Sequence, residues 1–173
     1  MTQAHMITRR RFGLMAAAAS LTVAPRAAVG AAFREITWED LIPPGEPYSE
    51  IVGDGKFDAV NDVWVPEFDE HGAKLNPELD GALVKLPGYI IPLEMGAEGV
   101  TDFVLVPYVG ACIHVPPPPP NQLVLVSAKD PWPSESLWDA VWVSGRMTAQ
   151  LASTEVAQTG YRIEAEKVEA YQW

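Results

Sequence analysis

The stretch YRIEAEKVEA, residues 161–170, alternates apolar and polar side chains in the way of a β-strand. Tyr161, Ile163 and Ala165 fall on one side of an extended chain, while acidic residues fill much of the other side. Because successive side chains of a strand point to opposite faces, this pattern predicts one buried and one solvated face. The stretch therefore indicates a fold built on β-strands.

Four stretches upstream of it also have strand composition: residues 82–93, 102–106, 122–127 and 140–147. Gly and Pro turns separate them, and Gly88 and Gly145 sit inside strand patterns, where glycine commonly marks a bulge or a sharp bend. Residues 148–159 are consistent with a short helix or a loop. This inventory predicts a mainly β domain, a single OB-like five-stranded antiparallel barrel with one or two short helices, over residues 76–173.

Residues 33–75 are predicted to be an irregular N-terminal extension of that barrel. Turn sequences such as Pro43-Pro44-Gly45 and Gly53-Asp54-Gly55 interrupt it repeatedly. The segment TWEDL, residues 37–41, has a Thr followed by acidic residues, which is a typical helix start. We therefore expect one short helix in an otherwise irregular segment.

Residues 1–32 have the three regions of a twin-arginine signal peptide. TRRRFGL, residues 8–14, contains the arginine pair, and the apolar stretch 15–23 after it is too short for an ordinary membrane-spanning helix. Small residues follow, so we expect cleavage after Ala31 or Ala32. The sequence thus predicts a periplasmic protein with no integral membrane segment in its mature part.

The mature part is strongly acidic. The chain has 23 acidic and 12 basic residues, and four of the basic residues but none of the acids precede Phe33, so the mature net charge is 8 minus 23, or −15. A field of this sign repels phosphate backbones and anionic lipids, and it attracts cations or basic surfaces. Charge therefore argues against nucleic acid as a partner.

The segment GACIHV, residues 110–115, contains the lone cysteine and a histidine two positions later. In an extended chain, Cys112 and His114 face the same side with Cα atoms about 6.6 Å apart. Thiolate and imidazole are ligands that zinc and copper accept, although a complete site needs further donors, from distant acids or from His71. Three interpretations stay open: a buried structural thiol, a transition-metal ligand pair, and a reactive or partner-bonding thiol.

Five prolines follow, Pro116, Pro117, Pro118, Pro119 and Pro120, and then Asn121 and Gln122. Such a run locks the backbone into a stiff polyproline II rod of about 15 Å. The rod is able to stiffen the Cys–His loop or to dock on a partner, and we take residues 116–122 as the candidate partner-contact loop. A second candidate contact is Pro131-Trp132-Pro133, which we expect in an exposed loop.

No catalytic residue is assigned, because the chain lacks a GxSxG motif, an HExxH motif and a phosphate-binding glycine loop. The segments LDG (79–81), GYIIPL (88–93), FVLVPY (103–108) and above all GACIHVPPPPPNQ (110–122) resemble those of domain-of-unknown-function family 3299, small exported bacterial proteins. The resemblance supplies no activity. It implies an association with envelope transporter components and zinc-handling proteins.

These observations favour a non-enzymatic periplasmic binding or accessory module, associated with an envelope protein or a transporter component. A zinc- or copper-binding protein that uses Cys112 and His114 is one alternative, and a thiol-based enzyme is the other.

Overall fold

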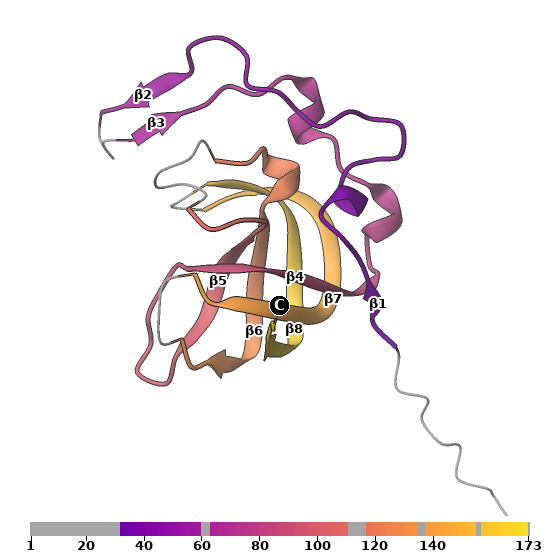
Figure 1. Cartoon of the computed structure of the whole chain (residues 1–173), viewed down its shortest axis with the longest axis vertical. Helices are drawn as coiled ribbons and strands as arrows, with labels where there is room; N and C mark the ends of the chain where they lie inside the picture. Colours follow the sequence, from indigo (N-terminus) through magenta and orange to yellow (C-terminus); the bar gives the residue numbers. More distant parts are fainter. Residues whose placement is uncertain (1–31, 60–62, 111–116, 135–137, 155–156, 173) are drawn as a thin grey trace, which may run out of the picture. The chain divides into compact units, whose positions relative to one another are not determined.

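The computed structural model describes residues 32–59, 63–110, 117–134, 138–154 and 157–172. Five strands of its six-stranded main sheet form a barrel: β4 (Leu83–Pro92), β5 (Val100–Val106), β6 (Val124–Trp132), β7 (Ala140–Ser153) and β8 (Gln158–Ala170). They pair in the order β4-β5-β6-β8-β7, and a further pairing of β4 with β7 closes the ring (Figure 1). This strand order is that of an OB-like barrel, so the predicted fold is confirmed.

One pairing in the barrel differs from the all-antiparallel prediction. β6 and β8 run parallel, with Val126 opposite Ile163, whereas the other barrel pairings are antiparallel. The reason is topological: strand direction cannot alternate all the way round a closed ring with an odd number of strands. A closed five-stranded barrel must therefore contain a parallel pair.

Four of the five barrel strands are longer than the sequence pattern indicated, whereas β4 is slightly shorter than the predicted stretch 82–93. β7 continues to Ser153, which pairs with Gln158 of β8, so residues 148–153 form a strand and not the short helix or loop predicted over 148–159. The register between β7 and β8 shifts at Ser144/Gly145, which confirms the predicted bulge. A Cβ on Gly145 would lie 2.2 Å from the carbonyl oxygen of Glu164, so only glycine allows this close approach.

The short helices are all of the 3-10 type in the part of the chain that is described. They are η1 (Glu39–Leu41), η2 (Glu70–Ala73), η3 (Pro77–Leu79) and η4 (Pro120–Gln122). η1 lies where a short helix was expected, but its N-cap is Trp38 and not Thr37. The backbone N–H and hydroxyl of Thr37 both donate to the Asp40 carboxylate. No helix among the described residues is long and apolar enough to cross a membrane.

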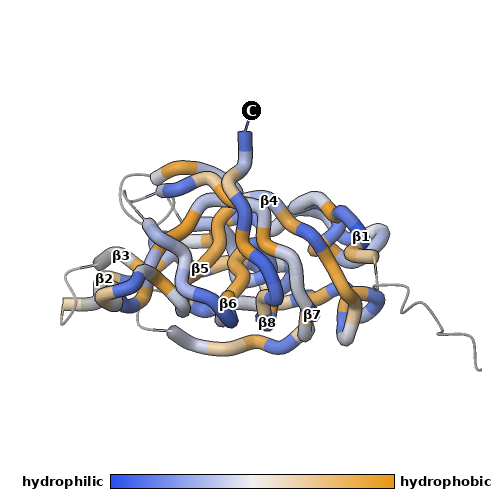
Figure 2. Tube along the Cα trace, turned by 90° about the horizontal axis from the view of Figure 1, so that it is seen from below, coloured by the Kyte–Doolittle hydropathy of each residue, from blue (hydrophilic) through white to orange (hydrophobic). Residues whose placement is uncertain are grey.

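The alternation along β8 separates core from solvent as predicted. Tyr161, Ile163 and Ala165 are buried, whereas Arg162 and Glu164 between them are exposed. Figure 2 shows apolar and polar residues alternating along the barrel strands.

β5 is buried on both faces, because Phe103 and Leu105 belong to the main core whereas Val104 and Val106 form a second apolar cluster with Leu123. Burial of these apolar side chains supplies the hydrophobic stabilisation of the barrel.

The extension before the barrel packs into the same core. β1 (Arg34–Glu35) pairs with β4, and Ile36 and Leu41, which follow β1, are buried in the barrel core. The buried Tyr161 hydroxyl donates to the carbonyl oxygen of Leu41 at 2.6 Å and accepts from the backbone N–H of Asn76 at 2.6 Å. Burial raises the pKa of Tyr161 to about 12. This tyrosine therefore joins both ends of the extension to the barrel.

A second, two-stranded sheet lies outside the ring of barrel strands (Figure 1). β2 (Lys56–Asp58) pairs antiparallel with β3 (Val63–Val65). Backbone pairing continues on either side of these strands in the sequence. The backbone N–H of Val52 donates to the Glu67 carbonyl at 2.8 Å, and the backbone N–H of Asp69 donates to the Glu50 carbonyl at 3.0 Å. We call residues 48–70 the hairpin arm.

Candidate functional site

The predicted metal ligands Cys112 and His114, together with Pro116, lie outside the described residues. The zinc or copper prediction therefore stays a prediction. Across the described ranges, no group of three or more His, Cys, Asp and Glu side chains is placed to hold a metal ion.

The described prolines form an ordered segment at the rim of the barrel. Pro118 and Pro119 are buried, and Pro119 has φ −63° and ψ 159°, the polyproline II conformation. Pro120 then begins η4, which leads into β6. The proline rings restrict the backbone dihedral φ, so this segment has little conformational freedom. We call residues 117–120 the proline wall.

Asn121 and Gln122 fix that wall to the extension. Both side chains are buried: the Asn121 amide donates to the carbonyl oxygens of His71 at 2.9 Å and Lys74 at 3.1 Å, and the Gln122 amide donates to the Trp38 carbonyl at 3.0 Å. These two residues of the predicted contact loop therefore position the prolines, of which Pro117 and Pro120 are partly exposed.

The hairpin arm exposes an unusual number of apolar side chains. Nine large apolar residues are exposed among those described, and six of them belong to the arm. Phe57 is 63% exposed, Val65 48% and Trp64 38%. Scattered exposed apolar residues are ordinary, but a concentration on one element marks a contact surface. The six are Tyr48, Ile51, Val52, Phe57, Trp64 and Val65.

A groove separates the arm from the proline wall, and we call it the proline groove. Its volume is about 180 Å³, which takes one or two side chains. The arm provides one side, the prolines provide the other, and the start of β6 and the β7–β8 connection complete it. The lining residues are Trp64, Val65, Pro66, Phe68, Pro117, Pro118, Pro120, Leu123, Ala157 and Gln158, none of which titrates.

A second, shallower depression adjoins the proline groove. Its volume is about 350 Å³, and it shares Phe68, Pro117 and Pro118 with the groove. Tyr48 and Tyr108 also line it, and partial burial beside Tyr108 raises the pKa of the Tyr48 hydroxyl. Two neighbouring apolar hollows thus lie on either side of a common ridge formed by Phe68 and the prolines.

A polar network holds the base of the arm in place. The Glu46 carboxylate contacts Lys74 Nζ at 2.9 Å and His71 Nδ1 at 2.7 Å. Both contacts lower the pKa of Glu46, and the contact with Lys74 contributes most. Asp69 accepts from the Ser49 hydroxyl at 2.7 Å, which lowers the pKa of Asp69. His71, considered from the sequence as a further metal donor, is thus engaged with Glu46.

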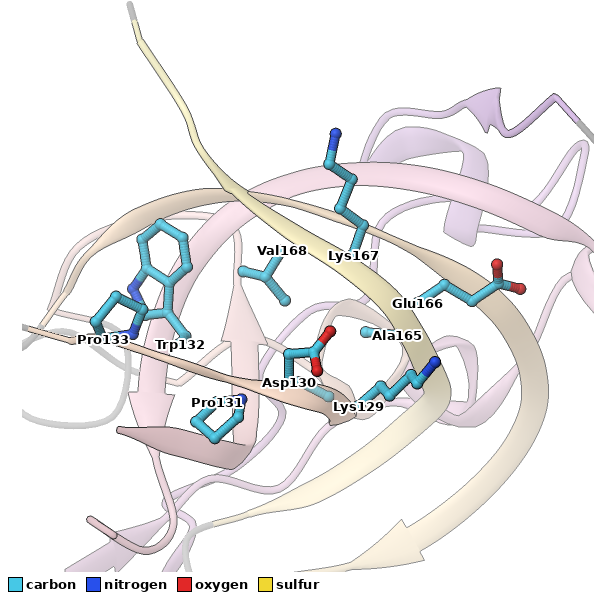
Figure 3. A pocket seen from close by; sticks show the side chains of 10 residues that line it. Lys129, Asp130, Pro131, Trp132, Pro133, Ala165, Glu166, Lys167 and Val168 are labelled. Atoms are coloured by element: carbon cyan, nitrogen blue, oxygen red, sulfur yellow. The ribbon is translucent and has the colours of Figure 1, made fainter. Parts of the chain in front are cut away.

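A different pocket opens at the other end of β6, with a volume of about 200 Å³. Trp132 and Val168 line its apolar part, whereas the charged ends of Lys129, Glu166 and Lys167 point away from them (Figure 3). Lys167 is also paired with Glu169 at 2.7 Å. Asp130 lines the pocket as well, so four of its ten lining residues are charged, whereas none of those that line the proline groove is. This pocket is therefore the weaker candidate for an apolar contact.

Trp132 itself differs from its prediction as an exposed loop residue. It ends β6 and is half-buried, because its indole N–H donates to the Asp139 carboxylate at 3.1 Å and its ring packs against the barrel core. The arm residues Trp64, Val65 and Phe68 were in turn missed. Their signal is the apolar triplet VWV at 63–65, directly after the Asn61-Asp62 turn.

Comparison with known proteins identifies the family to which this fold belongs. The family model described as "Protein of unknown function (DUF3299)" matches residues 38–170. A crystal structure of a DUF3299 family protein from Pseudomonas aeruginosa PAO1 is similar, with 39% sequence identity and a TM-score of 0.66 over 82% of this chain and 98% of that one. No curated protein matches. With the family match spanning both the hairpin arm and the barrel, the chain belongs to the DUF3299 family.

Proposed function

We propose that this chain is a non-enzymatic binding module of the periplasm, which holds an extended segment of an envelope protein in the proline groove. The observation that carries the proposal is the concentration of exposed apolar side chains on the arm, beside a groove whose lining residues contain no titratable group. Such a lining favours contact with apolar side chains over acid–base or nucleophilic chemistry.

The dimensions of the two hollows favour an extended segment. A groove of about 180 Å³ is too small for a folded domain to enter, whereas alternate side chains of an extended chain point the same way about every 6.6 Å. One such side chain is able to enter the groove and the next one on that face the adjoining depression. Rigid prolines and aromatic residues provide contact area at little cost in conformational entropy.

The periplasmic location rests on the twin-arginine segment TRRRFGL at residues 8–14. A transporter component is the partner class that the family resemblance indicates. A protein partner is also consistent with the negative charge, which disfavours nucleic acid and anionic lipid.

A selection from a random, phage-displayed peptide library tests the proposal. The purified protein serves as bait, and the selected peptides are then titrated against two variants. Val65→Asp places a charge in the groove, and Met95→Asp places the same charge at a comparably exposed apolar residue ahead of β5, at the end of that strand away from the prolines. Both sites are exposed, so neither change should unfold the protein.

We expect apolar peptides to be enriched and to lose at least about tenfold in affinity on Val65→Asp, with little change on Met95→Asp. Failure of any peptide to enrich, or equal losses on both variants, would contradict the proposal.

A further inference from the structure

The hairpin arm combines its exposed apolar residues with a high density of negative charge. Residues 48–70 contain seven acids and one lysine, a net charge of 1 minus 7, or −6. The arm thus holds −6 of the −15 of the mature chain in 23 residues. Acidic and apolar groups therefore occupy the same surface element.

Several of these acids are solvent-facing, and one of them lines a hollow. Glu50 lines the shallower depression, and Glu67 directly precedes Phe68 of the shared ridge. Glu50, Asp54 and Glu67 are exposed, and within the described ranges no ion pair neutralises any of the three. Lys74, at the base of the arm, is engaged by Glu46 at 2.9 Å and lies 4.0 Å from Glu70.

Resting on the proposed function, we infer that the segment held in the proline groove is cationic, with lysine or arginine flanking its apolar side chains. Unneutralised acids beside an apolar groove attract a basic segment and reject an acidic one, so charge adds selectivity to an apolar contact that has little of its own. The same field opposes occupation by a second copy of this chain, whose mature part carries −15.

The charge of the selected peptides tests this inference separately from their apolar character. One selected peptide is resynthesised with flanking Lys, Gln or Glu, and its dissociation constant is measured at low and high salt. Two triple variants are compared: Glu50→Gln with Asp54→Asn and Glu67→Gln on the arm, and Glu94→Gln with Glu164→Gln and Glu166→Gln on the barrel. Both remove three exposed charges.

We expect the Lys-flanked peptide to bind about tenfold more tightly than the Gln-flanked one at low salt, and the difference to shrink at high salt, because exposed charges are screened. The arm variant should remove most of that difference and the barrel variant little of it.

Apolar peptides that bind equally well with Lys, Gln or Glu flanks would overturn the inference while leaving the proposed function intact. Equal effects of the two triple variants would also overturn it, since the arm would then have no special part. Absence of binding by every peptide would remove the proposed function and this inference with it.

Discussion

The barrel and the hairpin arm use the same kinds of side chains and place them in opposite environments. In the barrel, Phe103 and Val126 are fully buried, whereas in the arm Phe57 is 63% and Val65 48% exposed. The barrel closes through β4 and β7, so that its strands enclose a large apolar core; the arm has two strands of three residues each. A two-stranded sheet gains little stability alone. The apolar residues of the arm are thus better explained by binding than by folding.

Truncating one phenylalanine in each region gives the largest expected contrast. Phe103→Ala should lower the free energy of unfolding by about 3–5 kcal/mol, because it leaves a cavity in a closed core. Phe57→Ala should change it by less than about 0.5 kcal/mol. Urea titration followed by circular dichroism measures both, and similar losses for the two variants would show that the arm contributes to the folded core.

Removal of the hydroxyl that joins the extension to the barrel should have the next largest effect. Tyr161→Phe leaves the buried Leu41 carbonyl and the Asn76 N–H without their partner. We expect a loss of about 1–3 kcal/mol in the same urea titration. A neutral result would mean that the other contacts of the extension, including the β1–β4 pairing and the Asn121 and Gln122 hydrogen bonds, hold it without this hydroxyl.

The same residue gives the barrel a dependence on alkaline pH. The pKa of Tyr161 is about 12 in the folded protein against 10 for a free tyrosine, so the unfolded chain loses this proton first as pH rises. Folding stability should therefore fall as pH rises from 10 towards 12, and more steeply in the wild type than in Tyr161→Phe. Parallel stability curves for the two proteins would argue against this coupling.

The smallest expected effect concerns the polar base of the arm. Glu46→Gln removes the negative charge from the partly buried contacts with Lys74 and His71, and ion pairs that solvent still reaches contribute little to global stability. We expect an unchanged urea midpoint but faster tryptic cleavage after Lys56, because the arm is held less firmly. In the wild type, the contacts of Glu46 should weaken only at a pH below the ordinary pKa of glutamate, because the pKa of Glu46 is lowered. An unchanged rate of tryptic cleavage would mean that contacts other than those of Glu46 hold the arm.

The sequence predicted the barrel better than the candidate site. Alternation over long stretches such as 161–170 is imposed by burial of one face, so all five barrel strands were recognisable. The parallel pairing of β6 and β8 follows from closure of a ring with an odd number of strands, and no local sequence pattern indicates that closure. Residues 148–153 resembled a helix or loop because their strand depends on pairing with β8.

The proline groove shows why binding surfaces are harder to predict. The prolines were identified by composition, but the opposite wall comes from Trp64, Val65 and Phe68, in a segment whose turns suggested irregular structure. Only the arm's fold brings these walls together, across about 50 residues of sequence. Cys112 and His114 lie outside the described residues, so the metal interpretation stays a prediction.

The most direct test locates a bound peptide on the molecule with two indole signals. Trp64 lines the proline groove and its indole N–H donates to the Asp54 carbonyl, whereas Trp132 lines the pocket at the other end of β6 and donates to Asp139. A selected basic, apolar peptide is titrated into ¹⁵N-labelled protein, with the two signals assigned from Trp64→Phe and Trp132→Phe. We expect the Trp64 indole signal to shift and the Trp132 signal to stay; a shift of the Trp132 signal alone would contradict the account.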